Sequence, residues 1–283
     1  MSFIRRTSGA LFLFTLSLTI LSAQGAQAVA SESLVPEASV PPLPEVVTRV
    51  AGAGTHATQA FDTPTGLKGW VIEKGELPPA LIYTTSDGKY AFLGNIVDAA
   101  GRNLTASYVE TYIQDPMWPQ FERSTFITEG ATKPTQVVYA VMDPNCIYCH
   151  ILWQALQPYE KEGLQVRWVP VGIIKPDSAG KAAAILQASD PAAALKAAHA
   201  GYVEQEESAG IEPVKLSPET QAELLSNLHL AQRFGMRGTP MIVFRDHRTD
   251  KLVTLSGLPK LRSLGDTLGL PQVPSDPALK SSW

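Results

Sequence analysis

The sequence predicts an α/β fold, α+β overall, in which a small β-rich domain precedes a larger domain built on a sheet. Residues 60–105 hold short aromatic and β-branched runs separated by Gly, Pro and Asn turns, which is typical of a small antiparallel unit. The apolar run 136–142 indicates a buried strand, and residues 151–156 follow it without a helix breaker. A second β-branched run at 164–171 completes a strand–helix–strand order, which favours nearly parallel pairing of the two strands.

Length and composition fit two ordinary globular domains. The chain has 283 residues, of which 45% are hydrophobic and 18% are charged. This apolar content is enough for two buried cores. The formal net charge is −4, and no basic stripe is present, so we expect no nucleic-acid partner.

The N-terminus has the pattern of a cleavable export signal. Two arginines precede the 12-residue apolar stretch Ala10–Leu21, which is too short to cross a bilayer. A small-x-small site predicts cleavage after Ala28, with cleavage after Ala30 as the alternative. The signal peptide is therefore expected at 1–28. The mature protein is then expected in an oxidising compartment outside the cytoplasm.

The first ordered part of the mature chain is expected to bind or associate rather than catalyse. Residues 29–44 are rich in Pro, Ser and Ala and predict a flexible lead-in. A domain is expected over 45–104, beginning with a short helix and containing no cluster of catalytic residues. Its strands are expected at 70–72, 80–84 and 90–97.

The segment 105–126 is predicted to be a helical linker. Four apolar residues, Tyr108, Val109, Tyr112 and Ile113, share one helical face. Pro116 and Pro119 are expected to break or kink this helix.

The second domain, expected over 127–270, has the element order of a thioredoxin-like fold with a helical insertion. After the first strand and helix, Pro158 is expected to kink or end the helix. The insertion covers about 176–234, and a β-hairpin and a closing helix follow it. Its three helices are expected at 179–188, 191–209 and 217–234. The last strands are expected at 241–244 and 252–255, the closing helix at 259–268, and a disordered tail at 271–283.

Both cysteines lie where a strand passes into a helix, in the run Asp143-Pro-Asn-Cys-Ile-Tyr-Cys-His150. Unpaired N–H groups and the positive dipole end at a helix start favour a thiolate, so the pKa of Cys146 should fall. Asn145 is expected to be the N-cap. Cys149 lies about one turn further on, and the ring that the two close is too small to restrain much unfolded chain. We therefore predict a redox pair in which Cys146 attacks and Cys149 resolves.

Three other interpretations of these cysteines compete with the redox pair. A passive structural disulfide is disfavoured, because a helix start activates a thiol. Zinc needs about four ligands, and the five histidines show no pair at the usual spacing, so no metal is expected. Cys146-Ile-Tyr-Cys149-His150 also matches the Cys-x-x-Cys-His attachment signature of c-type haem. The preferred interpretation of His150 is a solvated helix residue.

Gly238-Thr239-Pro240 stands directly before the predicted third strand of the second domain. Most X–Pro bonds are trans, and a proline here cannot donate to a sheet ladder. In thioredoxin-like folds, however, this position faces the cysteines. A cis bond there would expose the backbone of Thr239 to an extended substrate.

With these motifs, the chain resembles the DsbC and DsbG family of periplasmic thiol:disulfide interchange proteins, nearer to DsbG, over essentially the whole mature chain. In the first domain the resemblance is carried by residues 63–70 and 82–89. In the second domain it is carried by residues 143–149, Trp153, 171–176, 182–186, 189–191, 238–240 and 257–259. The stretches at 171–176 and 182–191 separate this family from thioredoxins that lack the insertion.

The resemblance implies a V-shaped homodimer that pairs through cystatin-like N-terminal domains, with the linker helices holding the catalytic domains over a shared cleft. It implies that Cys146 is the nucleophile, Cys149 the resolving thiol and Pro240 a cis proline, without a cofactor. It implies a periplasmic enzyme, kept reduced by a membrane reductase of the DsbD type, that acts on oxidised or misfolded exported proteins. Its reaction would be the reduction or isomerisation of disulfides, or the rescue of sulfenylated cysteines.

One departure concerns the residues between and after the cysteines. Ile147 stands where DsbG has Pro and DsbC has Gly, so the thiolate pKa and the reduction potential are expected to differ; Tyr148 and His150 are further candidates for tuning that pKa. Two other functions stay open at this point. One is a chaperone-like binding module for unfolded exported proteins with secondary redox activity, and the other is a c-type haem protein.

Overall fold

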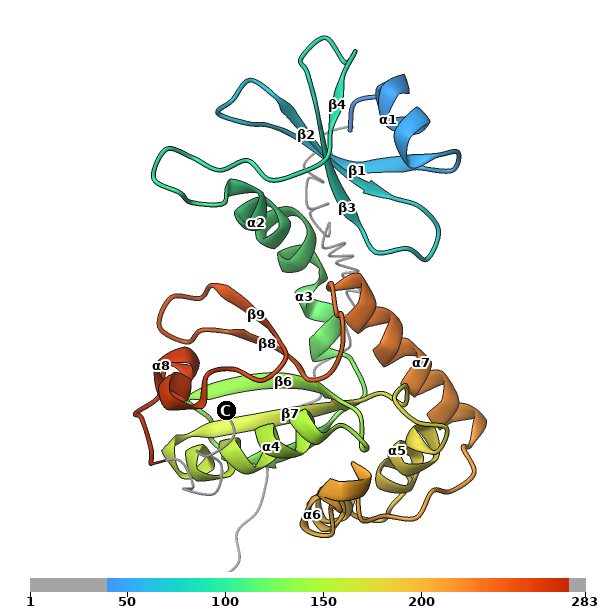
Figure 1. Cartoon of the computed structure of the whole chain (residues 1–283), viewed down its shortest axis with the longest axis vertical. Coiled ribbons are helices and arrows are strands. Elements are labelled where there is room, and N and C mark those ends of the chain that lie inside the picture. The colour runs from blue at the N-terminus through green and yellow to red at the C-terminus, as the bar shows by residue number, and fades with distance from the viewer. Residues whose placement is uncertain (1–39, 275–283) are drawn as a thin grey trace, which may run out of the picture. The chain divides into compact units, whose positions relative to one another are not determined.

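The computed structural model describes residues 40–274 (Figure 1). The predicted signal peptide, most of the lead-in and residues 275–283 of the predicted tail lie outside the described residues. The first element of the described part is α1 (Glu45–Ala51), the short helix expected at the start of the first domain. Within residues 40–274, no helix has both the length and the apolar content that a membrane span requires.

The N-terminal sheet has four antiparallel strands in the order β1-β2-β3-β4. The strands are β1 (His56–Asp62), β2 (Lys68–Glu73), β3 (Ala80–Thr84) and β4 (Ala91–Phe92). β1 was not predicted, because most of its side chains are polar or only half-buried and show no clear alternation. The strand expected at 90–97 pairs only through β4, and Val97 forms an isolated bridge to Asn103. Val47 of α1 packs on Trp70, Ile72 and Ile82 to form the core of this unit.

The linker stays helical through both prolines, contrary to the predicted break. It comprises α2 (Leu104–Val109), a π-helical turn (Glu110–Gln114) and α3 (Asp115–Glu122). Pro116 falls in the first turn of α3, and the wider π turn directly before it rearranges the hydrogen bonds that a proline cannot make. Tyr112 stacks on Phe61 of the N-terminal sheet at 4.1 Å between ring centroids. Phe121 packs on Tyr139 of the second sheet at 5.8 Å.

The second sheet has five strands in the order β5-β7-β6-β8-β9, and only β6 and β7 are parallel. The strands are β5 (Ile127–Gly130), β6 (Gln136–Met142), β7 (Leu164–Pro170), β8 (Met241–Arg245) and β9 (Leu252–Ser256). The predicted parallel strand pair and the closing hairpin are thus present. β5 was not predicted, because it has only four residues and two of them are exposed.

Helices cover both faces of this sheet (Figure 1). The helices of this domain are α4 (Ile147–Leu156), α5 (Ser178–Leu186), α6 (Pro191–Ala200), α7 (Pro218–Arg233) and α8 (Leu264–Leu268). Val138, Ala140 and Met142 of β6 pack with α4, α6 and α8 on one face of the sheet. Tyr139 and Val141 pack with α3 and α7 on the other face. Short 3₁₀ turns occupy Gln157–Glu162, Glu204–Glu206 and Leu261–Ser263. The 3₁₀ turn containing Pro158 follows α4, as expected.

The second helix of the insertion is shorter than its composition predicted. α6 ends at Ala200, not near 209, and the chain turns back so that Gly210 lies against Gly201. A Cβ atom at Gly210 would stand 2.4 Å from the carbonyl oxygen of Gly201, so this close backbone approach requires glycine. The return segment brings the Tyr202 hydroxyl to the backbone carbonyl of Asn145, directly before the cysteines, and brings Ser208 to Lys181 of α5.

Candidate active site

The cysteine pair occupies the junction of β6 and α4. Cys146 is itself the N-cap of α4, and its Sγ accepts a hydrogen bond from the backbone N–H of Cys149 at 3.3 Å. The expected N-cap, Asn145, is therefore wrong by one residue, because its side chain turns away from the helix to other partners. Both thiols are free in this structure. Cys146 is 4% exposed and Cys149 is fully buried.

The loop before β8 faces Cys146. β8 pairs with β6 through Met241 and Val141, and this pairing carries the preceding loop to the start of α4. The Thr239–Pro240 peptide bond is cis. The Cys146 thiol donates to the carbonyl oxygen of Thr239 at 3.3 Å. The Thr239 hydroxyl is buried and has no hydrogen-bond partner at acceptable geometry.

Cys146 is the activated thiol of the pair. Its pKa is lowered to about 7, first because the Cys149 thiol donates to its sulfur, then through the Thr239 side chain and the backbone N–H groups of Cys149 and Tyr148. Burial acts in the opposite direction, because it disfavours the charged form. About half of Cys146 is therefore thiolate at pH 7, against a few per cent for an unperturbed thiol.

Cys149 has the opposite character. Its pKa is raised well above that of an ordinary thiol, chiefly because the side chain is fully buried, and further by the neighbouring Cys146 sulfur. Because the two sulfurs are neighbours, a negative charge on one disfavours a charge on the other. Cys146 is therefore the thiol that ionises, and Cys149 stays protonated. The geometry thus separates a readily ionised thiol, Cys146, from a partner that stays protonated, Cys149.

Asp143 organises the turn that carries the cysteines, a role that sequence reasoning did not assign to it. Its carboxylate is fully buried and accepts the backbone N–H groups of Ile173 at 2.7 Å and Ile174 at 3.0 Å. It also accepts from the Ser178 hydroxyl at 2.8 Å and the Asn145 N–H at 2.9 Å. A charged acceptor with four donors joins the cysteine turn to the segment after β7. An aspartate placed directly after a buried strand and before the cysteines is the sequence signal that could have revealed it.

His150 is buried, so its interpretation as a solvated residue is wrong. Its ring stacks on Tyr202 at 4.3 Å, and its Nδ1 lies 3.3 Å from Nδ1 of His199. Burial lowers the pKa of His150, and it lowers the pKa of His199 to about 3. This arrangement does not fit covalent haem, since Cys149 and His150 both point into packed side chains. Among residues 40–274, no group of three or more His, Cys, Asp or Glu side chains could hold a metal.

A half-buried carboxylate lies next to two tryptophans at the cysteine helix and the sheet. Glu129 of β5 accepts both indole N–H groups of Trp153, at 2.9 Å, and Trp168, at 2.8 Å. Burial raises the pKa of Glu129. Sequence analysis missed Glu129 because the short strand that carries it was not predicted. The two tryptophans belong to α4 and β7, so this carboxylate ties the cysteine helix to the sheet.

The surface next to the cysteines is apolar. Tyr148 is 42% exposed, and Ile173 and Ile174 are 44% and 45% exposed. Both isoleucine N–H groups bind Asp143, so these side chains are held beside the cysteine turn. Ile147 is only half-buried. This surface suits an extended chain with apolar side chains.

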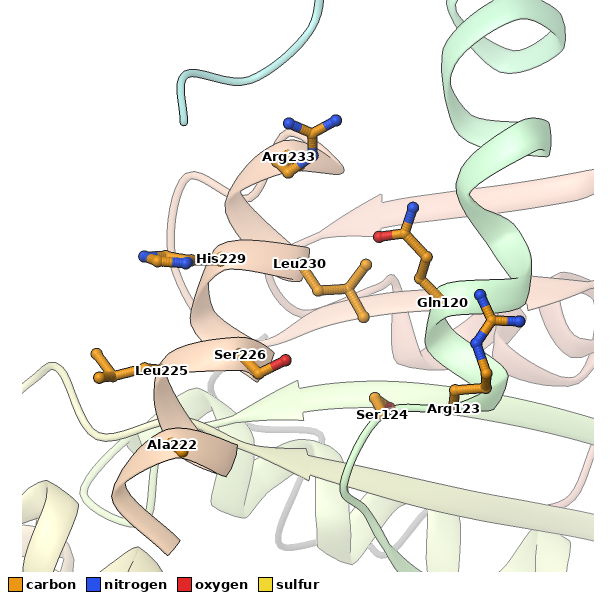
Figure 2. A pocket seen from close by; sticks show the side chains of 9 residues that line it. All are labelled: Gln120, Arg123, Ser124, Ala222, Leu225, Ser226, His229, Leu230 and Arg233. Carbon is orange, nitrogen blue, oxygen red and sulfur yellow. The ribbon is translucent and has the colours of Figure 1, made fainter. Parts of the chain in front are cut away.

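A groove of about 610 Å³ lies away from the cysteines, between α3 and α7. Its polar groups do not converge on one point (Figure 2). Leu225 and His229 project from the side of α7 that faces away from α3. Arg233 is engaged in a 3.0 Å ion pair with Glu73. The groove therefore lacks the convergent charged groups of a catalytic site.

Comparison with known proteins agrees with this geometry. The thioredoxin-like domain family matches residues 123–262, and the disulfide bond isomerase protein N-terminal domain family matches residues 34–106. The chain is 30% identical to thiol:disulfide interchange protein DsbG of Pseudomonas aeruginosa, covering 91% of this chain and 97% of the relative. It is 32% identical to DsbG of Escherichia coli K12, over 80% and 92% of the two chains. It is 31% identical to DsbC of Haemophilus influenzae, over 63% and 71%.

The two thiols are expected to titrate far apart. Ultraviolet thiolate absorbance of the reduced protein should rise by one thiolate in a step centred near pH 7, because Cys146 ionises there and Cys149 does not. The step should disappear in Cys146→Ala. Two thiolates forming together in the ordinary thiol range would contradict the assignment of Cys146 as the activated group.

Proposed function

The chain belongs to the DsbC/DsbG family of thiol:disulfide interchange proteins, and we propose that it reduces or isomerises disulfides of exported proteins in the periplasm. As a member of this family it is a thiol:disulfide oxidoreductase or isomerase. One observation carries the proposal for these residues. A nearly buried thiol with a pKa of about 7 lies beside a second thiol whose pKa is raised, at a helix start that faces the Thr239–Pro240 loop.

The proposed reaction begins with attack of the Cys146 thiolate on a substrate disulfide. A bond forms between Cys146 and one substrate sulfur, the substrate S–S bond breaks, and the departing sulfur leaves as a thiolate that takes up a proton. In reduction, Cys149 loses its proton and attacks Cys146, so that the protein disulfide forms and the substrate leaves with both thiols reduced. In isomerisation, another substrate thiolate attacks the mixed disulfide and releases Cys146 without net oxidation.

Two further steps are part of this proposal. With a sulfenylated substrate cysteine, the Cys146 thiolate forms the same mixed disulfide and the oxygen leaves as water after protonation. Each reduction leaves the protein oxidised, so the cycle needs a dithiol reductant, which we assign to a membrane reductase of the DsbD type. The apolar surface of Tyr148, Ile173 and Ile174 supports clients with exposed apolar segments, and a chaperone-like role is the second candidate function for the same reason.

Thr239 and Pro240 are proposed to hold the substrate chain. The hydrogen bond from the Cys146 thiol to the Thr239 carbonyl, at 3.3 Å, supports this role, because it shows that this backbone lies next to the proposed nucleophile. An extended substrate would pair with the Thr239 backbone, as a strand pairs with a sheet edge. The buried Thr239 hydroxyl, which lacks a partner, lies close enough to both sulfurs to lower the pKa of each.

We also propose a homodimer that pairs through the N-terminal domain, placed at 45–104, with 105–126 as the linker and 127–270 as the catalytic domain. β4 is an edge strand, and large apolar side chains on and beside it are exposed. These residues are Tyr90 at 64%, Phe92 at 46%, Leu93 at 70% and Val97 at 56% exposure. An edge strand with such a patch is typically covered by another chain.

Removal of the resolving thiol should trap substrates. Cys149→Ala is expected to accumulate mixed disulfides with exported proteins, visible on non-reducing gels and lost on reduction, because nothing inside the protein can release Cys146. Cys146→Ala should trap none. The binding module would be favoured instead by two results together. Cys149→Ala would trap no proteins, and the Cys146→Ala, Cys149→Ala double variant would still fully suppress client aggregation.

Loss of the Thr239 hydroxyl should slow the reaction with a disulfide only at a pH below the pKa of Cys146. Thr239→Val is expected to reduce the rate with a small disulfide at pH 6 by about threefold, as for a rise of about half a unit in the Cys146 pKa. The rate well above that pKa should be unchanged. Thr239→Ser, which keeps the hydroxyl, is the control. An equal loss in both variants at every pH would argue for a packing effect.

Charged residues on the β4 edge should separate the dimer. Light scattering is expected to give twice the chain mass for the wild-type protein and the single-chain mass for a Phe92→Asp, Leu93→Asp variant, because paired burial of two carboxylates is unfavourable. Leu77→Asp changes a leucine that is 59% exposed elsewhere in the same domain and should remain dimeric. A dimer that survives the edge substitutions would place the interface on another surface.

A further inference from the structure

Asn145, the residue directly before Cys146, is held by the helical insertion. It is fully buried, although the sequence order places it on a turn between a strand and a helix. Its backbone N–H donates to Asp143 at 2.9 Å, within the same turn. Its other polar groups have partners from residues 176–234, which lie far along the chain.

The insertion reaches Asn145 from two segments. From the start of α5, the Asn145 amide nitrogen donates to Asp177 Oδ1 at 2.9 Å and to Ser178 Oγ at 3.0 Å. Its amide oxygen accepts from Lys181 Nζ at 3.0 Å. From the segment after α6, the Tyr202 hydroxyl donates to the Asn145 backbone carbonyl at 3.1 Å. All polar groups of Asn145 are therefore satisfied in one rigid arrangement.

Lys181 is an unusual member of this network. The residue is 5% exposed, and its ammonium contacts Asp177 Oδ2 at 3.0 Å and the Ser208 hydroxyl as well as Asn145. Burial of an ammonium is unfavourable, and a well-packed apolar residue would often serve stability as well or better. The buried charge therefore needs an explanation other than packing, and its contact with the residue before the nucleophile supplies one.

We propose that the helical insertion positions the nucleophile, and that Lys181 is a positioning residue that acts on Cys146 through Asn145. This inference deepens the proposed function and rests on it for the role of Cys146 as nucleophile. The chemistry follows from the N-cap geometry. Cys146 Sγ accepts the Cys149 N–H at 3.3 Å only while the preceding peptide keeps its orientation.

The charges around the turn work in the same direction. Asp143 and Asp177 are the carboxylates bonded to this network, and Tyr202 and Cys149 are the other titratable groups close to Cys146. Lys181 is the cation bonded to it. Lys181 offsets one of the two carboxylate charges, and without its ammonium both are uncompensated, which disfavours a further anion on Cys146. Loss of Lys181 should therefore raise the pKa of the nucleophile both by loosening Asn145 and by removing a positive charge.

The test compares Lys181→Met with Lys181→Gln. For Lys181→Met, the thiolate absorbance step should move upward, and the rate with a small disulfide at pH 6 should fall about tenfold, as for a rise of about one unit in pKa. At a pH well above the Cys146 pKa of both proteins, the rates of Lys181→Met and the wild type should become equal. A general loss of structure would not produce this convergence. Lys181→Gln keeps a donor for Asn145 and should recover part of the shift. Lys215→Met removes an exposed cation from the same insertion and should titrate as the wild type.

The outcomes separate this inference from the proposed function. A folded Lys181→Met protein with a wild-type thiolate step overturns the positioning role, whatever its stability. If Lys181→Met does not fold, Tyr202→Phe decides, because it removes only the hydroxyl that holds the Asn145 carbonyl. An upward shift of the thiolate absorbance step in Tyr202→Phe, smaller than the one expected for Lys181→Met, supports the proposal. A thiolate step at the wild-type pH overturns it. The titration needs no substrate, so a protein that shows these shifts but traps no client contradicts the function and not the positioning.

Discussion

A negative charge on Cys146 has to be stabilised where water scarcely reaches it, and the arrangement of the catalytic domain depends on this requirement. The sulfur is nearly buried, and burial alone would keep it protonated. Groups fixed by the fold reverse this effect: the N–H groups at the start of α4, the Cys149 thiol and the nearby Thr239 side chain. They belong to the helix start and the loop before β8, so the site exists only when β6 and β8 are paired.

The same burial that opposes the charge on Cys146 gives Cys149 its character. Cys149 lies one turn deeper in the apolar core and stays protonated while its neighbour is a thiolate. In the reduction that we propose, Cys149 therefore has to lose its proton before it can release an intermediate on Cys146.

Polar groups buried around the cysteines hold the turn in place, and apolar groups beside them remain exposed. Asp143 anchors the turn to the segment after β7, and the insertion anchors Asn145. That polar network is fully satisfied, which makes it rigid. Ile173 and Ile174 use only their backbones in it, so their side chains stay free to meet a client. One set of contacts therefore fixes the reacting sulfur and presents the surface that we propose binds substrate.

Local patterns in the sequence determined most of the catalytic domain. The strand at 136–142, the position of the cysteines at a helix start and the closing hairpin all follow from periodicity and spacing. The pairing partner of each buried polar group does not, because such groups meet across long sequence separations. Asn145 was expected to cap α4, His150 to be solvated, and Pro116 and Pro119 to break or kink the linker, since each residue behaves so when judged by its neighbours alone. Only the tertiary structure, which brings α5, α6 and β5 to the cysteine helix, decided that Asn145 binds Lys181, that His150 is buried against Tyr202, and that Glu129 holds two tryptophans.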